Sequence, residues 1–98
     1  MKKLDISNLA QEDLLQLYTF MAENNVEAAV RLMRTFQQKF ELLAQFPEMG
    51  KERNEIVIGW RSFPVGKYIV FYQVSGDVLE IARVRHGSSD IDNLFEDL

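Results

Sequence analysis

The polar residues best suited to chemistry gather near the end of the chain, where Arg83, Arg85 and His86 precede Gly87–Asp90. Alternate residues of a strand share a face, so Arg83 and Arg85 should lie together with His86 opposite, unless a bulge intervenes. Arg61 is on a neighbouring segment and could join them. Arginines bind phosphate, and a histidine with a pKa of about 6.5 can move a proton. Together they would offer the chemistry of a metal-independent ribonuclease.

Two other interpretations of this group stay open. In one, Arg83 and Arg85 pair with the acidic residues of the C-terminus and His86 only ends a strand. In the other, the group recognises a macromolecular surface, with Ser88 and Asp90 contributing to it. The chain has one histidine and no cysteine, and it lacks the glycine-rich phosphate loop and the serine-hydrolase motif. We therefore expect no metal site and no cofactor.

The first half of the chain predicts an antiparallel helical hairpin that would help to position these residues. A short strand over Lys3–Ser7 precedes an amphipathic helix that Asn8 can cap. Asn24–Asn25 interrupts the pattern, and Asn24 can cap a second helix. Over Val26–Leu43 apolar residues recur at alternating spacings of three and four, which is a heptad-like seam. This helix should end at Phe46, because a residue before proline is driven out of the helical region.

After Gly50 the apolar period becomes two, which predicts strands. Three of them are expected: Ile56–Phe63, Tyr68–Val74 and Val78–Arg85. Turns at Pro64–Gly66 and Gly76–Asp77 would join them into a meander, and Ser89 can cap a short C-terminal helix. The predicted fold class is α+β, as one domain over residues 1–98. Its order is strand-helix-helix-strand-strand-strand, with the helical hairpin packed on a mostly antiparallel sheet.

The middle strand is apolar on both faces, since Tyr68, Val70 and Tyr72 alternate with Ile69 and Phe71. The helical hairpin can cover only one of these faces. Either the C-terminal helix covers the other, or part of that apolar surface receives a partner.

Composition narrows the class of protein. The chain of 98 residues is 47% hydrophobic and 27% charged, which suits a single packed domain. No long apolar run and no signal-peptide pattern is present, so we expect a cytoplasmic protein without a membrane partner. The net charge of −4 argues against direct nucleic-acid binding, because phosphate contacts need Lys or Arg. Residues 53–86 are nevertheless locally basic, with five Lys or Arg against three acids.

Four stretches, taken in order and with their spacing, resemble the ParE-type toxins of the RelE/ParE superfamily, the toxin half of bacterial toxin–antitoxin pairs. They are Ala10–Leu14 (AQEDL), Phe40–Gly50 (FELLAQFPEMG), Gly59–Tyr72 (GWRSFPVGKYIVFY) and Ile81–Ile91 (IARVRHGSSDI). The resemblance spans nearly the whole chain and implies the same fold as the periodicity does, a helical hairpin against an antiparallel sheet.

The resemblance also implies an activity. ParE-like proteins are not enzymes; they trap DNA gyrase on cleaved DNA, and a ParD-like antitoxin neutralises them through its C-terminal segment. The target-binding candidates are then Arg61, Arg83, Arg85, His86, Ser88 and Asp90. The candidates for an antitoxin groove on the hairpin and the sheet edge are Leu14, Tyr18, Phe36, Phe40, Tyr68 and Tyr72.

Two alternatives follow from the same resemblance. RelE-type members cut mRNA on the ribosome, and for such an endoribonuclease Arg61, Arg83 and His86 would be catalytic. A member that has lost toxicity would only bind its antitoxin. A basic residue often follows His-Gly-Ser in ParE-type tails, whereas this chain has Ser89 there. That departure bears on the strength of gyrase inhibition.

Overall fold

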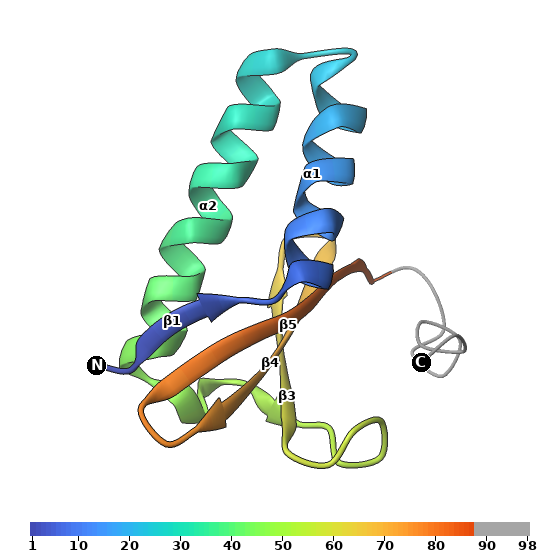
Figure 1. The fold of residues 1–98 in the computed structure, drawn as a ribbon. Coiled ribbons are helices and arrows are strands. Elements are labelled where there is room, and N and C mark those ends of the chain that lie inside the picture. Colours follow the sequence, from blue (N-terminus) through green and yellow to red (C-terminus); the bar gives the residue numbers. More distant parts are fainter. Residues whose placement is uncertain (88–98) are drawn as a thin grey trace.

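A computed structural model describes residues 1–87 of the chain. Its helices and strands are β1 (Lys3–Ile6), α1 (Asn8–Ala22), α2 (Val26–Gln45), the short 3-10 helix η1 (Pro47–Met49), β2 (Lys51–Glu52), β3 (Trp60–Val65), β4 (Tyr68–Ser75) and β5 (Val78–His86). The two helices lie side by side on one face of the sheet, and their connecting turn projects beyond it (Figure 1). The predicted α+β class and element order are confirmed, while the helix predicted from Ser89 lies outside the described residues.

The strands form one sheet in the order β1-β5-β4-β3-β2. β1 pairs with β5 in parallel, and every other pair is antiparallel. A bulge interrupts the β4–β5 ladder, because Phe71 faces Arg83 while Tyr72 faces Ile81. Ala82 is the extra residue, and it shifts the alternation of β5 just before the polar cluster at its end.

The helix starts differ from the prediction by one residue. Ser7, not Asn8, caps α1, since its hydroxyl accepts a hydrogen bond from the Ala10 amide at 3.0 Å. Asn25, not Asn24, caps α2 through the Ala28 amide at 3.0 Å. Ser, Asp and Asn are nearly equivalent as caps, so the sequence could not choose between neighbours.

The strand predicted over Ile56–Phe63 was wrong in its first half. Residues 53–59 form a loop instead, in which the Arg53 carbonyl accepts hydrogen bonds from the amides of Ile56 and Val57. The predicted turn at Pro64 was also wrong, because β3 continues to Val65. β2 pairs only with Arg61 and Ser62. Pro64 therefore lies at a sheet edge, where a missing amide costs no ladder hydrogen bond.

Apolar side chains pack on both faces of the sheet. The main core, between sheet and helices, contains Ala10, Phe36, Phe40, Leu43, Val65, Val70, Tyr72, Leu79, Ile81 and Val84. A smaller cluster of Trp60, Phe71 and Ala82 lies separately, and Ile56, Val57 and Ile69 pack against it. Part of the second apolar face is thus covered by the loop before β3. The C-terminal helix, one of the two covers considered for this face, lies outside the described residues.

A neutral polar cluster attaches the end of α2 to the sheet. The fully buried Tyr72 hydroxyl donates to the Pro47 carbonyl at 2.6 Å and accepts from the Gly50 amide at 2.8 Å. Burial is the main cause that raises the pKa of Tyr72 above its usual value. A Cβ on Gly50 would lie 2.5 Å from that hydroxyl and 2.8 Å from the Ser62 carbonyl oxygen, so only glycine fits there without a shift.

Candidate functional site

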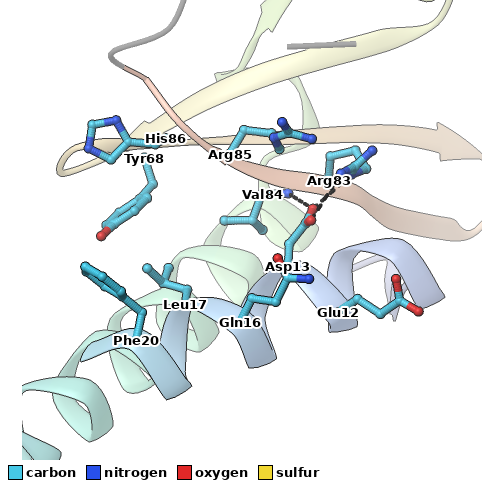
Figure 2. A pocket seen from close by; sticks show the side chains of 10 residues that line it. All are labelled: Glu12, Asp13, Gln16, Leu17, Phe20, Tyr68, Arg83, Val84, Arg85 and His86. Atoms are coloured by element: carbon cyan, nitrogen blue, oxygen red, sulfur yellow. Dashed lines mark hydrogen bonds and ion pairs between the residues drawn. The ribbon is translucent and has the colours of Figure 1, made fainter. Parts of the chain in front are cut away.

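A hollow of about 440 Å³ lies between α1 and the end of β5. Figure 2 shows its lining side chains, which come from α1, from the start of β4 and from β5. They are Glu12, Asp13, Gln16, Leu17, Phe20, Tyr68, Arg83, Val84, Arg85 and His86. Three of the residues singled out for chemistry, Arg83, Arg85 and His86, therefore share this site, here called the α1/β5 hollow.

Asp13 fixes one wall of the α1/β5 hollow. Its carboxylate accepts two hydrogen bonds from the Arg83 guanidinium, at 2.9 and 3.1 Å, and one from the Val84 amide at 3.0 Å. The two side chains are only 13% and 10% exposed. A bidentate arginine pair of this kind is directional, and it joins α1 to β5 across 70 residues of sequence. The guanidinium of Arg83 thus forms an ion pair with Asp13 within the protein.

Beyond the end of β1, the edge of β5 forms its hydrogen bonds with Ser7, which caps α1, and with Asp13 of α1. The Ser7 amide donates to the Ile81 carbonyl at 3.0 Å, and the Ser7 hydroxyl donates to the Ala82 carbonyl at 2.8 Å. Asp13 then accepts from Val84, two residues farther along. These hydrogen bonds hold the start of α1 against β5, where the two elements form the walls of the α1/β5 hollow.

The register of β5 divides the polar residues between two faces. Arg83 and Arg85 are opposite Phe71 and Ile69, and residues directly opposite share a face. His86 is opposite Tyr68, and their rings meet edge to face with centroids 5.4 Å apart. This agrees with the predicted alternation. Tyr68 also packs on a core ring, so it holds the exposed His86 at the rim of the hollow.

Arg61 does not join this group. Its guanidinium donates to the Gly50 carbonyl at 2.7 Å and pairs with Glu52 at 3.4 Å, near the end of α2. It lines a separate hollow beside β2 and β3. The candidates Ser88 and Asp90 lie outside the described residues.

The six candidates for an antitoxin groove are also divided. Phe36, Phe40 and Tyr72 are at most 1% exposed and belong to the core, so they do not line a groove. Leu14 and Tyr18 are half-buried on α1, and of the six only Tyr68 lines the α1/β5 hollow.

Six residues that line the α1/β5 hollow were not among the predicted site residues: Glu12, Asp13, Gln16, Leu17, Phe20 and Val84. Phe20 lies off the apolar stripe of α1 and is 68% exposed. That position, an aromatic residue on the polar side of an amphipathic helix, was the available signal.

The α1/β5 hollow is amphipathic. Its apolar wall contains Leu17, Phe20 and Tyr68, while Arg85 and His86 stand at its rim. Such a surface suits an amphipathic peptide segment, whose apolar anchors enter the hollow. Within residues 1–87, no three His, Cys, Asp or Glu side chains are grouped as metal ligands, and neither helix is both long and apolar enough to span a bilayer.

Comparison with known proteins gives a consistent result. The family model described as the ParE toxin of the type II toxin–antitoxin system parDE matches residues 4–91. Toxin ParE1 of Caulobacter vibrioides is 35% identical over 89 residues, which cover 90% of this chain and 92% of that protein. Toxin RelE3 of the same organism is 29% identical, covering 88% and 95% of the two chains. A chain of the chromosomal ParDE system from P. aeruginosa has the same fold, with a TM-score of 0.75, 21% identity, and coverage of 88% and 96%.

Proposed function

The chain belongs to the ParE toxin family of type II toxin–antitoxin systems, and we propose that it inhibits DNA gyrase and is neutralised by a ParD-like antitoxin. The family match over residues 4–91 includes nearly every element of the fold. It therefore supports the assignment to the toxin class over the whole described domain.

The observation that favours gyrase inhibition over mRNA cleavage is the dispersal of the three candidate catalytic residues. Arg83 is neutralised by Asp13, and Arg61 is held beside Gly50 and Glu52. His86 stands at the rim of the α1/β5 hollow, which Arg61 does not line. A general acid–base mechanism needs each of its groups within hydrogen-bond reach of the atom on which it acts, in one bound substrate. This arrangement supports a toxin that acts by binding.

The α1/β5 hollow is the proposed antitoxin site. Its apolar wall complements a peptide segment with apolar anchors, and its lining carries charges of both signs, with Glu12 on α1 and Arg85 on β5. Phe20 is the most exposed apolar residue of this wall. Burying a side chain of that size contributes about 2 kcal/mol to binding, which makes Phe20 the expected anchor point on the toxin.

Purified protein, gyrase and supercoiled plasmid test the proposed target. We expect cleaved plasmid to accumulate, and we expect His86→Ala to weaken this activity at most and not to abolish it, because His86 is a target-binding candidate and no proton transfer is required. A matched assay with ribosomes and mRNA tests the alternative. Cutting of mRNA that His86→Ala abolishes, without cleaved plasmid, would contradict gyrase inhibition and identify an endoribonuclease. Neither activity from a folded protein would leave a non-toxic member that only binds its antitoxin.

A further inference from the structure

A second hollow, of about 380 Å³, lies at the turn between β3 and β4. Its volume is within the range of about 300–1,000 Å³ that is usual for ligand sites. It adjoins the α1/β5 hollow, because Tyr68 and His86 line both. Its other lining residues are Pro64, Gly66, Lys67, Ile69 and Gly87, and it is here called the β3–β4 turn hollow.

Backbone contacts hold the walls of the β3–β4 turn hollow in place. β3 and β4 are joined by a two-residue turn in which Gly66 has φ of 57°, as is usual in tight hairpins. The Gly87 amide donates to the Lys67 carbonyl at 2.8 Å, which holds the end of β5 against this turn. A Cβ on Gly87 would lie only 3.3 Å from that carbonyl oxygen and from the Ile69 side chain. A hollow that is formed in advance costs little conformational entropy when a partner binds.

Charge distinguishes the β3–β4 turn hollow from its neighbour. The α1/β5 hollow contains both signs, with Glu12 and Asp13 on α1 and Arg85 on β5. Among the described residues, no acidic side chain lines the β3–β4 turn hollow, whereas Lys67 does. Lys67 is exposed, and no residue within 1–87 forms an ion pair with it. The β3–β4 turn hollow therefore favours an acidic residue on its partner.

Continuity with the α1/β5 hollow indicates which partner this is. Figure 2 shows Tyr68 and His86 at one end of the α1/β5 hollow, and their rings form the boundary between the two hollows. A peptide segment that leaves the α1/β5 hollow over this ring pair enters the β3–β4 turn hollow directly. There it meets the apolar Pro64 and Ile69 beside Lys67. A nucleic acid needs several cations, and one lysine does not supply them.

We propose that the antitoxin segment bound in the α1/β5 hollow continues over Tyr68 and His86 into the β3–β4 turn hollow and places an acidic residue against Lys67. The inference rests on the proposed function, because it extends the antitoxin site proposed above. A segment that takes this path covers His86, which is a target-binding candidate. Antitoxin and target then compete for the same residue, so neutralisation includes direct occlusion.

Single cysteines test this path, because the chain contains none of its own. Gln16→Cys reports on the α1/β5 hollow and Pro64→Cys on the β3–β4 turn hollow, since both positions are exposed and line these hollows. Lys51→Cys is the matched control, because Lys51 is exposed on β2 and lines neither hollow. The rate of modification by a maleimide is measured for each full-length variant when free, when unfolded in urea, and when bound to the purified antitoxin encoded beside the gene.

Antitoxin at about 100 times its dissociation constant leaves about 1% of the toxin free. It should therefore slow the modification of Gln16→Cys and Pro64→Cys at least about tenfold, and that of Lys51→Cys less than about twofold. Protection of Gln16→Cys alone overturns the inference and leaves the proposed antitoxin site in place. Without protection of Gln16→Cys the proposed site fails, and the inference with it. A folded wild type that binds no antitoxin overturns the proposed function.

A different result in the free protein would assign the β3–β4 turn hollow to another part of this chain. If Pro64→Cys in the free folded chain already reacts at least about tenfold more slowly than in urea, while Lys51→Cys does not, the hollow is occupied without antitoxin. That outcome overturns the inference.

Charge reversal tests the role of Lys67. Lys67→Glu should weaken antitoxin binding about fivefold at low salt, because an attraction becomes a repulsion. Lys51→Glu changes the net charge of the protein equally and should bind within about twofold of the wild type. Isothermal titration calorimetry of the three proteins at two salt concentrations measures this difference. Equal affinities of the two variants would overturn the pairing of Lys67 with an acidic residue of the antitoxin.

Discussion

The two helices of the hairpin are attached to the sheet by polar clusters of opposite character. At the α1 end, the charged pair of Asp13 and Arg83 borders the α1/β5 hollow, and both side chains keep about a tenth of their surface exposed. At the α2 end, the neutral Tyr72 hydroxyl bridges Pro47 and Gly50 with no exposure at all. Each cluster joins residues that are distant in sequence.

The difference follows from depth. Burying a charge costs far more than burying a hydroxyl, and an ion pair offsets that cost only with good geometry and further hydrogen bonds. Asp13 meets this condition with three hydrogen bonds beside the α1/β5 hollow. A hydroxyl needs only one donor and one acceptor, which Gly50 and Pro47 supply. The charged cluster therefore suits the border of a site, and the neutral cluster suits the interior.

Asp13→Ala should have the largest effect on stability. It leaves the Arg83 guanidinium and the Val84 amide without the carboxylate that both contact, so we expect a loss of about 3 kcal/mol. Urea denaturation followed by circular dichroism measures it. Glu12→Ala is the matched control, because that neighbouring carboxylate is exposed and should change stability by less than about 0.5 kcal/mol. Equal effects of the two variants would show that the buried pair has no special role.

Gly50→Ala should rank second, with a loss of about 1–3 kcal/mol from overpacking against Tyr72 and the Ser62 carbonyl. The same substitution in a Tyr72→Phe background sharpens the prediction. Because that background lacks the hydroxyl only 2.5 Å from the added methyl group, the double variant should lose less than the sum of the two single losses. Denaturation of all four proteins gives the coupling free energy, and simple additivity would contradict the steric argument.

The fold could be predicted from the sequence in most of its elements, but not in the loop before β3. Local periodicity predicted the helical hairpin, the meander and the fold class, because those patterns depend on which face of an element is buried. It failed over Ile56–Gly59, where three consecutive apolar residues look like a strand. The hydrogen bonds of the Arg53 carbonyl and the left-handed Gly59, with φ of 90°, make a loop there.

The candidate site was predictable only in part. The alternation of Arg83, Arg85 and His86 follows from strand geometry alone. The partner of Arg83 does not, because Asp13 is 70 residues away and its charge also suits the start of a helix. Phe36 and Phe40 show a second limit, since an apolar stripe does not tell which of its members the core will enclose completely.

The smallest effect concerns the pH dependence of the neutral cluster. Burial raises the pKa of Tyr72, so the unfolded chain loses the phenolic proton at a lower pH than the folded protein does. The stabilisation from Tyr72 is then fully present below about pH 10, the ordinary tyrosine pKa, and is lost as the pH rises toward the folded value. The free-energy advantage of the wild type over Tyr72→Phe should shrink above pH 10 by at most about 1.4 kcal/mol per pH unit. Urea denaturation of both proteins from pH 8 to 11.5 measures this difference, in which the titration of groups common to both cancels. An advantage that stays constant across this range would mean that the Tyr72 hydroxyl ionises as readily in the folded protein as in the unfolded chain.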